Sequence, residues 1–159
     1  MIRVFFLASL FLVSLTATWA QPADLTGKIR VSYRDGDPAP NYGVEYHYYK
    51  TNSQLVFLDS TERSLNNYTW DSGTGRLTDS TFGEYFDYTY TGTDSGTFVF
   101  SEGGMGEFVI YDASWDLDYD GTPDGEQIDA GILPKYPHEQ LGMASLDTSS
   151  FWLSNEGVS

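Results

Sequence analysis

Apolar and polar residues alternate along much of the chain between residues 22 and 114. In the segment KIRVSYR at 28–34, Ile29, Val31 and Tyr33 alternate with charged or hydroxylated residues. A period of two predicts a β-strand with one buried face and one face in water. Similar runs, rich in the aromatic and β-branched residues that favour strands, lie at 42–49, 54–58, 82–90, 96–100 and 106–111.

The predicted strands are separated by segments rich in glycine, aspartate and serine. Examples are DGDPAP at 35–40, DSGTG at 71–75 and TGTDSG at 91–96. Short strands joined by turns of this composition are typical of antiparallel all-β domains. We therefore predict a mainly β fold, either a single antiparallel β-sandwich or a small β-barrel. The pattern leaves both architectures open.

The pattern changes after residue 114. Residues 115–131 form an Asp-rich loop, and residues 126–134 (EQIDAGILP) allow one helical turn before Pro134. Residues 138–145 allow a second turn, and residues 149–154 allow a last short strand. We therefore divide the chain into a β domain at 21–114, the loop at 115–131, and a short irregular or helical tail at 132–159 that packs on the β domain.

Residues 1–20 have the features of a secretory signal peptide. Arg3 supplies a positive charge, residues 4–15 are apolar, and small residues precede Gln21. The apolar run is shorter than the roughly 20 residues that span a bilayer, and its flanks match a signal that is removed. We expect a protein that is secreted or located at the cell surface or in the periplasm, without a membrane anchor after cleavage.

Charge and cysteine content narrow the choice of partners. The formal net charge is −15, which excludes nucleic acid and anionic lipid surfaces because both require a basic patch. The chain has no cysteine, so an exported domain of this kind depends on its core, on bound metal, or on both. Seven carboxylates and no Lys or Arg lie between Asp112 and Asp129. Such a cluster repels itself unless water or a cation neutralises it.

The segment DLDYDGTPDGEQIDAG at 116–131 has the spacing of a calcium-binding loop. Aspartates at positions 1, 3 and 5 point carboxylates at the ion, and Gly121 at position 6 permits the sharp turn. The expected oxygen ligands are Asp116, Asp118, Asp120, the Thr122 carbonyl, Asp124 and Gln127. Gln127 stands where such loops carry a bidentate glutamate, so Glu126 or Asp129 is the alternative final ligand. We expect one structural Ca²⁺ ion, bound more weakly than by the full motif.

Two resemblances accompany these motifs. The loop resembles the EF-hand-like loops of thrombospondin type 3 repeats and of related Asp-rich repeats in exported bacterial proteins; Pro123 and Gly125 match that form and Gln127 does not. Residues 22–101 resemble exported bacterial β-proteins with Tyr/Thr/Gly-rich repeats, on the segments NYTWDSGTGRLT (67–78) and DYTYTGTDSGTFVF (87–100). These resemblances imply calcium binding, export and β-structure, without implying a chemical activity.

Three functions are compatible with these features. The first is a non-catalytic exported domain, stabilised by one calcium ion, that acts as an extracellular binding or structural module with a glycan or surface protein as partner. The second is a small β-barrel that binds a small ligand or glycan through a tyrosine-rich face, formed by Tyr42, Tyr46, Tyr48, Tyr49, Tyr85, Tyr88 and Tyr90. The third is a hydrolase with a carboxylate pair, for which Glu45 and Glu84 are candidates.

The two histidines are predicted to be surface residues. His47 alternates with apolar residues on the face of its strand that the pattern assigns to water, and His138 lies in the tail between Pro137 and Glu139. The sequence contains no Gly-x-Ser-x-Gly, Gly-x-Gly-x-x-Gly or phosphate-loop motif. We therefore expect no catalytic residue and no organic cofactor.

Overall fold

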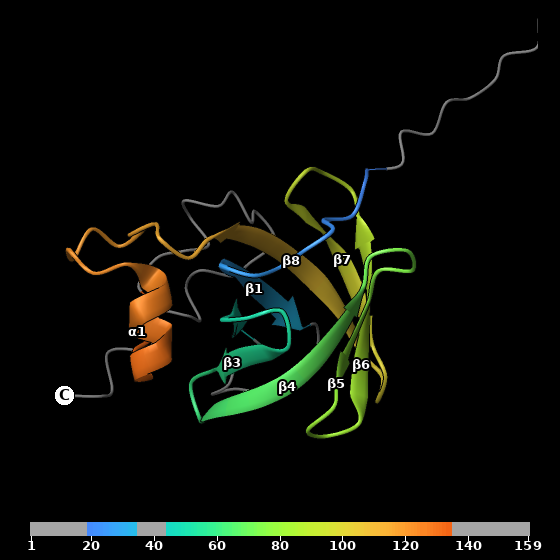
Figure 1. Cartoon of the computed structure of the whole chain (residues 1–159), viewed down its shortest axis with the longest axis horizontal. Coiled ribbons are helices and arrows are strands. Elements are labelled where there is room, and N and C mark those ends of the chain that lie inside the picture. Colours follow the sequence, from blue (N-terminus) through green and yellow to red (C-terminus); the bar gives the residue numbers. More distant parts are fainter. Residues whose placement is uncertain (1–18, 35–43, 135–159) are drawn as a thin grey trace, which may run out of the picture.

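Eight antiparallel strands form a closed barrel. The computed structural model describes residues 19–34 and 44–134, and all statements on structure refer to these ranges. The strands are β1 (Lys28–Arg34), β2 (Val44–Tyr49), β3 (Gln54–Leu58), β4 (Arg63–Asp71), β5 (Arg76–Asp79), β6 (Glu84–Tyr90), β7 (Ser95–Phe100) and β8 (Met105–Asp112). Each strand pairs with the next, and β1 pairs with β8 (Figure 1). The predicted mainly β, antiparallel fold is confirmed, and of its two forms the chain adopts the barrel.

Strands β4 and β5 are not among the six that the alternation predicts. In β4, Ser64 and Asn66 stand at positions that face the barrel interior, and Asn66 is buried while Leu65 is 51% exposed. The apolar and polar positions are therefore partly exchanged relative to an ordinary half-buried strand. Strand β5 has only four residues, too few for a period to stand out. In both strands, pairing with the neighbouring strands outweighs the local pattern.

The main core lies inside the barrel. Every strand except β1 contributes to it, and aromatic side chains predominate. Its buried members are Leu25, Tyr49, Leu55, Tyr68, Leu77, Phe86, Tyr88, Tyr90, Phe98, Phe100, Phe108 and Ile110. The rings pack in offset-stacked and edge-to-face pairs, such as Phe86 with Phe100 at a centroid distance of 4.8 Å and Tyr88 with Phe108 at 5.0 Å. Pairs of this kind add to the stabilisation that comes from area burial.

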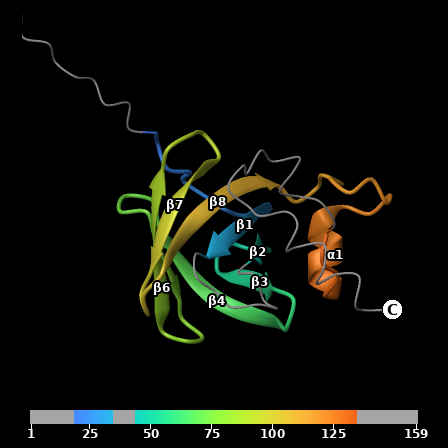
Figure 2. The ribbon, with the colours of Figure 1, turned by 180° about the vertical axis from the view of Figure 1, so that it is seen from behind.

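A second core lies outside the barrel wall, beneath the only helix of the described ranges. It joins the outer faces of β1, β2, β3 and β8 to helix α1 (Asp124–Ala130). Its buried members are Ile29, Val31, Tyr46, Val56, Leu58, Tyr111, Ala113 and Ile128. Figures 1 and 2 show α1 beside this part of the wall, at the opposite side of the barrel from β6 and β7. The helix ends at Gly131, whose φ of 80° is a left-handed conformation suited to glycine.

The segment before β1 and the segment after α1 both contact the barrel. The indole Nε1 of Trp70 donates a hydrogen bond of 2.8 Å to the carbonyl of Pro22, and Leu25 belongs to the main core. Beyond α1, the hydroxyl of Tyr46 donates to the carbonyl of Pro134 at 3.4 Å. Residues 1–18 of the predicted signal peptide, residues 35–43, and the tail from 135 onward, which includes His138, lie outside the described residues.

Helix α1 has seven residues, and no helix in the described part of the chain has the length and apolar character needed to cross a membrane.

Candidate functional site

A charged group occupies the interior of the barrel at β1 and β2. The register pairs Arg30 with His47 and Ser32 with Glu45, so these four side chains project from neighbouring positions of one wall. Arg30 Nη2 lies 3.0 Å from His47 Nε2 and 3.8 Å from Glu45 Oε2, and the Ser32 hydroxyl donates to Glu45 Oε2 at 3.5 Å. Arg30 is fully buried and His47 is 2% exposed. Buried charges persist only when they are paired in this way.

Aromatic rings from the opposite wall surround the guanidinium of Arg30. Its Cζ atom lies 4.8 Å from the ring centroid of Phe86, 4.9 Å from that of Tyr88 and 5.5 Å from that of Phe98. A desolvated cation over aromatic faces is stabilised by about 2 kcal/mol or more. The interior therefore combines a positive charge, a carboxylate and an imidazole with a lining of flat apolar faces.

Two phenol groups lie close to this charged group in the interior. Tyr49 and Tyr88 are both buried, and neither hydroxyl oxygen has a hydrogen-bond partner among the described residues. Burial raises the pKa of Tyr49 above its usual value, and the nearby charge of Arg30 partly offsets this shift. A buried polar group without a partner costs about 1–3 kcal/mol. Two such groups beside one buried cation indicate an interior that is suited to a further polar contact.

The prediction that His47 is a surface residue is wrong, as is the assignment of its strand face to water. Alternation shows that successive side chains point to opposite faces, but it does not show which face meets solvent. Here one face of β1 and β2 lies under α1 and the other lies inside the barrel, so both are buried. The sequence does contain a sign of this arrangement. Arg30 and Ser32 are two positions apart on β1, and Glu45 and His47 are two positions apart on β2, so each pair projects from a single face of its strand. Because these groups pair with one another, the interior tolerates them.

The tyrosines do not form a single face. Tyr46 belongs to the outer core, against which Tyr48 also packs, whereas Tyr49, Tyr88 and Tyr90 belong to the inner core. Tyr85 lies outside the wall under the guanidinium of Arg76, 4.0 Å from ring centroid to Cζ. Tyr42 lies outside the described residues. The two candidate carboxylates of the hydrolase hypothesis, Glu45 and Glu84, both occupy inward positions, on β2 and β6.

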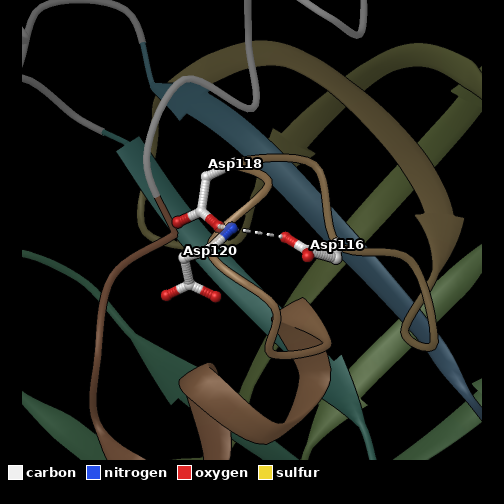
Figure 3. A group of neighbouring side chains, drawn as sticks. All are labelled: Asp116, Asp118 and Asp120. Carbon is white, nitrogen blue, oxygen red and sulfur yellow. Dashed lines mark hydrogen bonds between the residues drawn. The ribbon is translucent and has the colours of Figure 1, made fainter.

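The Asp-rich loop brings three of its aspartates together. Asp116, Asp118 and Asp120 each place one carboxylate oxygen within 4.8 Å of the others (Figure 3). Asp116 accepts hydrogen bonds from the backbone N–H groups of Asp120 (3.2 Å) and Gly121 (2.9 Å), which folds the loop around its carboxylate. Gly121 has a φ of 96°, the conformation for which the sequence predicts a glycine. Carboxylate oxygens in this arrangement are the ligands that calcium prefers.

The other predicted ligands are placed differently. Asp124 is fully buried; its oxygens accept hydrogen bonds from the Tyr111 hydroxyl at 2.8 Å and from the Leu117 backbone N–H at 3.1 Å. Burial is the main cause of its raised pKa. Asp129 pairs with Lys50 at 2.8 Å and with Arg63 at 3.0 Å, and its hydrogen bond with Lys50 is the main cause of its lowered pKa. Glu126 is exposed on the helix.

Gln127 points its amide group into the aspartate cluster. The side-chain Nε2 donates to Asp118 Oδ1 at 3.2 Å and lies 3.4 Å from the carbonyl oxygen of Thr122, another predicted ligand. The residue is 2% exposed, and its Oε1 has no hydrogen-bond partner among the described residues. The amide therefore lies between two oxygens that could also bind a cation.

Comparisons with known proteins identify no family. No family model matches the chain, and no curated protein matches its sequence. A crystal structure of an LTBP1 complex with LTC4 is similar at 16% identity and a TM-score of 0.38, over 76% of this chain and 79% of that chain. A mutant of LTBP1 in complex with leukotriene C4 is similar at 16% identity and a TM-score of 0.37, over 76% of this chain and 80% of that chain. At this level the likeness carries no argument about ligands.

Proposed function

We propose that this chain is a non-catalytic, exported binding module that holds one small molecule inside its barrel. The observation that carries the proposal is the pair of buried, unpartnered hydroxyls of Tyr49 and Tyr88, which lie with Arg30 in an aromatic interior. Eight-stranded barrels have an interior just wide enough to be filled by side chains or to hold one small ligand. Apolar interiors with a few convergent polar groups are the usual form of such sites.

The chemistry of the interior defines the class of ligand. Flat aromatic or conjugated faces stack on rings such as those of Phe86 and Phe98, which lie on neighbouring strands. A carboxylate or hydroxyl on the ligand then meets the tyrosine hydroxyls and the charge of Arg30. A sugar, which also has apolar faces, is the second class that this lining accommodates. The surroundings of Glu45, a guanidinium and an imidazole, favour a structural ion group over a hydrolytic carboxylate pair.

The first test of the proposal measures ligand binding. The purified mature chain is titrated with 1-naphthoic acid, 1-naphthalenemethanol and maltose by isothermal titration calorimetry, a readout that the absorbance of the naphthyl probes does not disturb. Saturable binding of one aromatic probe supports the proposal, and preference for the acid assigns the polar contact to Arg30. Saturable binding of maltose alone assigns the site to sugars. If none of the three binds, the interior is a packed core and the proposal fails.

Tyr88→Phe has opposite effects on the two readouts. Removal of a buried, unpartnered hydroxyl raises the free energy of unfolding of the ligand-free protein by about 1 kcal/mol. The same change weakens binding of the preferred probe about five- to tenfold, because it removes a hydrogen bond of the complex. Tyr48→Phe, on the outer side of the wall, leaves binding unchanged. A stabilised Tyr88→Phe variant with unaltered affinity would place the ligand elsewhere.

The signal peptide expected at residues 1–20 places this module outside the cytoplasm. N-terminal sequencing of the exported product checks this part of the proposal, and a first residue of Gln21 is the expected result.

A further inference from the structure

We propose that the Asp-rich loop is a calcium site in which Gln127 is a ligand through its Oε1 atom and Asp124 is not a ligand. The site would consist of Asp116, Asp118, Asp120, the Thr122 carbonyl and Gln127. It differs from the loop that the sequence spacing predicts, because position 9 is removed from the ligand set and neither Glu126 nor Asp129 replaces the missing glutamate.

The first argument is the position of the Gln127 amide. It is buried and directed at Asp118 and Thr122, yet its better acceptor, Oε1, has no hydrogen-bond partner in the described part of the chain. A half-turn about the Cγ–Cδ bond exchanges Nε2 and Oε1 without moving the rest of the side chain. In that orientation Oε1 faces the same point as the Asp118 carboxylate. A cation at this point supplies the partner that Oε1 lacks. It also replaces Nε2 as the group that the Asp118 carboxylate and the Thr122 carbonyl contact.

The second argument is charge. Asp116, Asp118 and Asp120 hold their carboxylates close together, and the sequence from Asp112 to Asp129 contains no Lys or Arg. The chain as a whole has a formal charge of −15, which adds to their repulsion. A divalent cation removes this repulsion, and a set of oxygen-only ligands without strict octahedral geometry favours Ca²⁺ over the smaller Mg²⁺.

The third argument concerns Asp124, which acts as an anchor. Its oxygens already accept hydrogen bonds from Tyr111 on β8 and from the backbone of Leu117. These bonds attach the start of α1 to the barrel wall beneath the loop. A cation bound above them would link the loop to Gln127, on the buried side of the same helix. Calcium would therefore hold α1 against the outer core in a chain that has no disulfides. Its role would be structural and not that of a calcium sensor.

The experiment compares thermal unfolding of metal-free protein in EDTA with unfolding in calcium chloride at about ten times the measured Kd. A loop with four acidic or amide side chains and no bidentate glutamate is expected to bind with a Kd of roughly 10⁻⁴–10⁻³ M. Ligand binding at this excess raises the melting temperature by about 4 °C. Magnesium at the same concentration gives a smaller shift. No shift with calcium, or an equal shift with both ions, overturns the proposal.

Terbium gives a readout that does not depend on unfolding. Trp115 precedes Asp116 and is 52% exposed, so its excitation sensitises emission from a lanthanide bound in the loop. Calcium is expected to displace terbium and abolish this emission. Emission that calcium does not displace would show that terbium binds another acidic surface, and it would count against the site.

Four variants test the ligand set. Gln127→Leu and Asp116→Asn are expected to abolish the calcium shift and the terbium signal, and Gln127→Glu is expected to enlarge the shift. Asp129→Asn is the matched control, because it lowers stability in EDTA by breaking the contacts with Lys50 and Arg63 and keeps the shift. A calcium shift that survives in Gln127→Leu, or that disappears in Asp129→Asn, overturns the assignment. For Gln127→Leu, circular dichroism in EDTA checks that the barrel is folded.

Discussion

At the scale of single residues, Gly96 on β7 marks a close approach of two backbones, those of β6 and β7. A Cβ atom built on Gly96 would lie 2.1 Å from the carbonyl oxygen of Thr89 and 2.9 Å from the Cα of Tyr90. Both neighbours are backbone atoms of the paired strand, so they cannot turn away as a side chain would. Gly96 is required here because the two strands approach too closely for any side chain.

Gly96→Ala is expected to lower the free energy of unfolding by about 3 kcal/mol, at the upper end of the range for overpacked sites. Urea denaturation followed by circular dichroism measures the change. Gly73→Ala is the control: its new Cβ would meet only the side-chain Oδ1 of Asp71, at 3.2 Å, and the expected loss is below about 1 kcal/mol. Equal losses in the two variants would contradict the role given to the close approach.

Single residues also show how far the sequence determines the site. The spacing of Asp116, Asp118 and Asp120 predicts that their carboxylates meet, because the contact is local and depends on one turn at Gly121. The partner of Asp124 is Tyr111, on a different element, and nothing in the loop's own sequence indicates that contact. The interior position of His47 depends on its pairing with Arg30, which a pattern within one strand does not reveal.

At the scale of elements, helix α1 is held by both packing and charge. Ile128 is fully buried against the outer core, and Asp129 on the same helix pairs with Lys50 and Arg63, which follow β2 and begin β4. Gly125 lets the first turn approach β8, since a Cβ there would lie 2.9 Å from the Ala113 carbonyl oxygen. A helix of seven residues is too short to persist by itself in water. Its stability therefore comes from these tertiary contacts.

Ile128→Ala is expected to lower the free energy of unfolding by about 3 kcal/mol, because it leaves a cavity between α1 and the wall. Ile132→Ala, one residue after Gly131 and 56% exposed, is the control with the same change of side chain and an expected effect within about 0.5 kcal/mol. Chemical denaturation of the two variants in one buffer gives the comparison. A small loss for Ile128→Ala would mean that α1 is not part of the cooperative unit.

Elements also show where sequence patterns succeed and fail. Alternation locates β1, because Ile29 and Val31 form an apolar outer face whereas Arg30 and Ser32 project from the other face. It does not locate β4, where Asn66 faces inward and its Nδ2 donates to Asp79 at 2.7 Å. The acceptor of that inward Nδ2 group lies on a strand that comes later in the chain. The helical turn predicted within residues 126–134 corresponds to α1, which begins two residues earlier, at Asp124, and ends at Ala130, before Gly131.

At the scale of the whole molecule, the aromatic interior makes stability depend on alkaline pH. Burial is the main cause of raised pKa values for Tyr49, Tyr68 and Tyr90. In the unfolded chain these phenols ionise near pH 10, whereas in the folded chain they keep their protons at higher pH. Their contribution to stability is therefore fully present below about pH 10 and is lost as pH rises above that value.

The free energy of unfolding is accordingly expected to fall steeply between about pH 10 and pH 11.5, and the tyrosinate absorbance that the buried phenols add to that of the exposed ones appears in step with loss of structure. Urea denaturation at a series of pH values, with ultraviolet absorbance on the same samples, measures both. Tyr49→Phe is expected to reduce the slope, and Tyr119→Phe, at an 81% exposed position, is expected to leave it unchanged. A free energy of unfolding that stays constant over this pH range would contradict the expectation.

The pairing of β1 with β8 has a consequence for when the chain folds. Lys28 and Asp112 form an ion pair of 3.2 Å across this seam although they are 84 positions apart. Among the strand pairings of the described residues, only that of β1 with β8 joins distant parts of the chain, and a non-local pairing of this kind forms slowly. Until β8 is available, β1 has an open edge that can pair with other chains. A chain exported unfolded through a secretion channel would therefore remain unfolded, and able to pass the channel, until almost all of the domain had emerged. A product truncated before residue 105 would lack β8 and would be prone to aggregate.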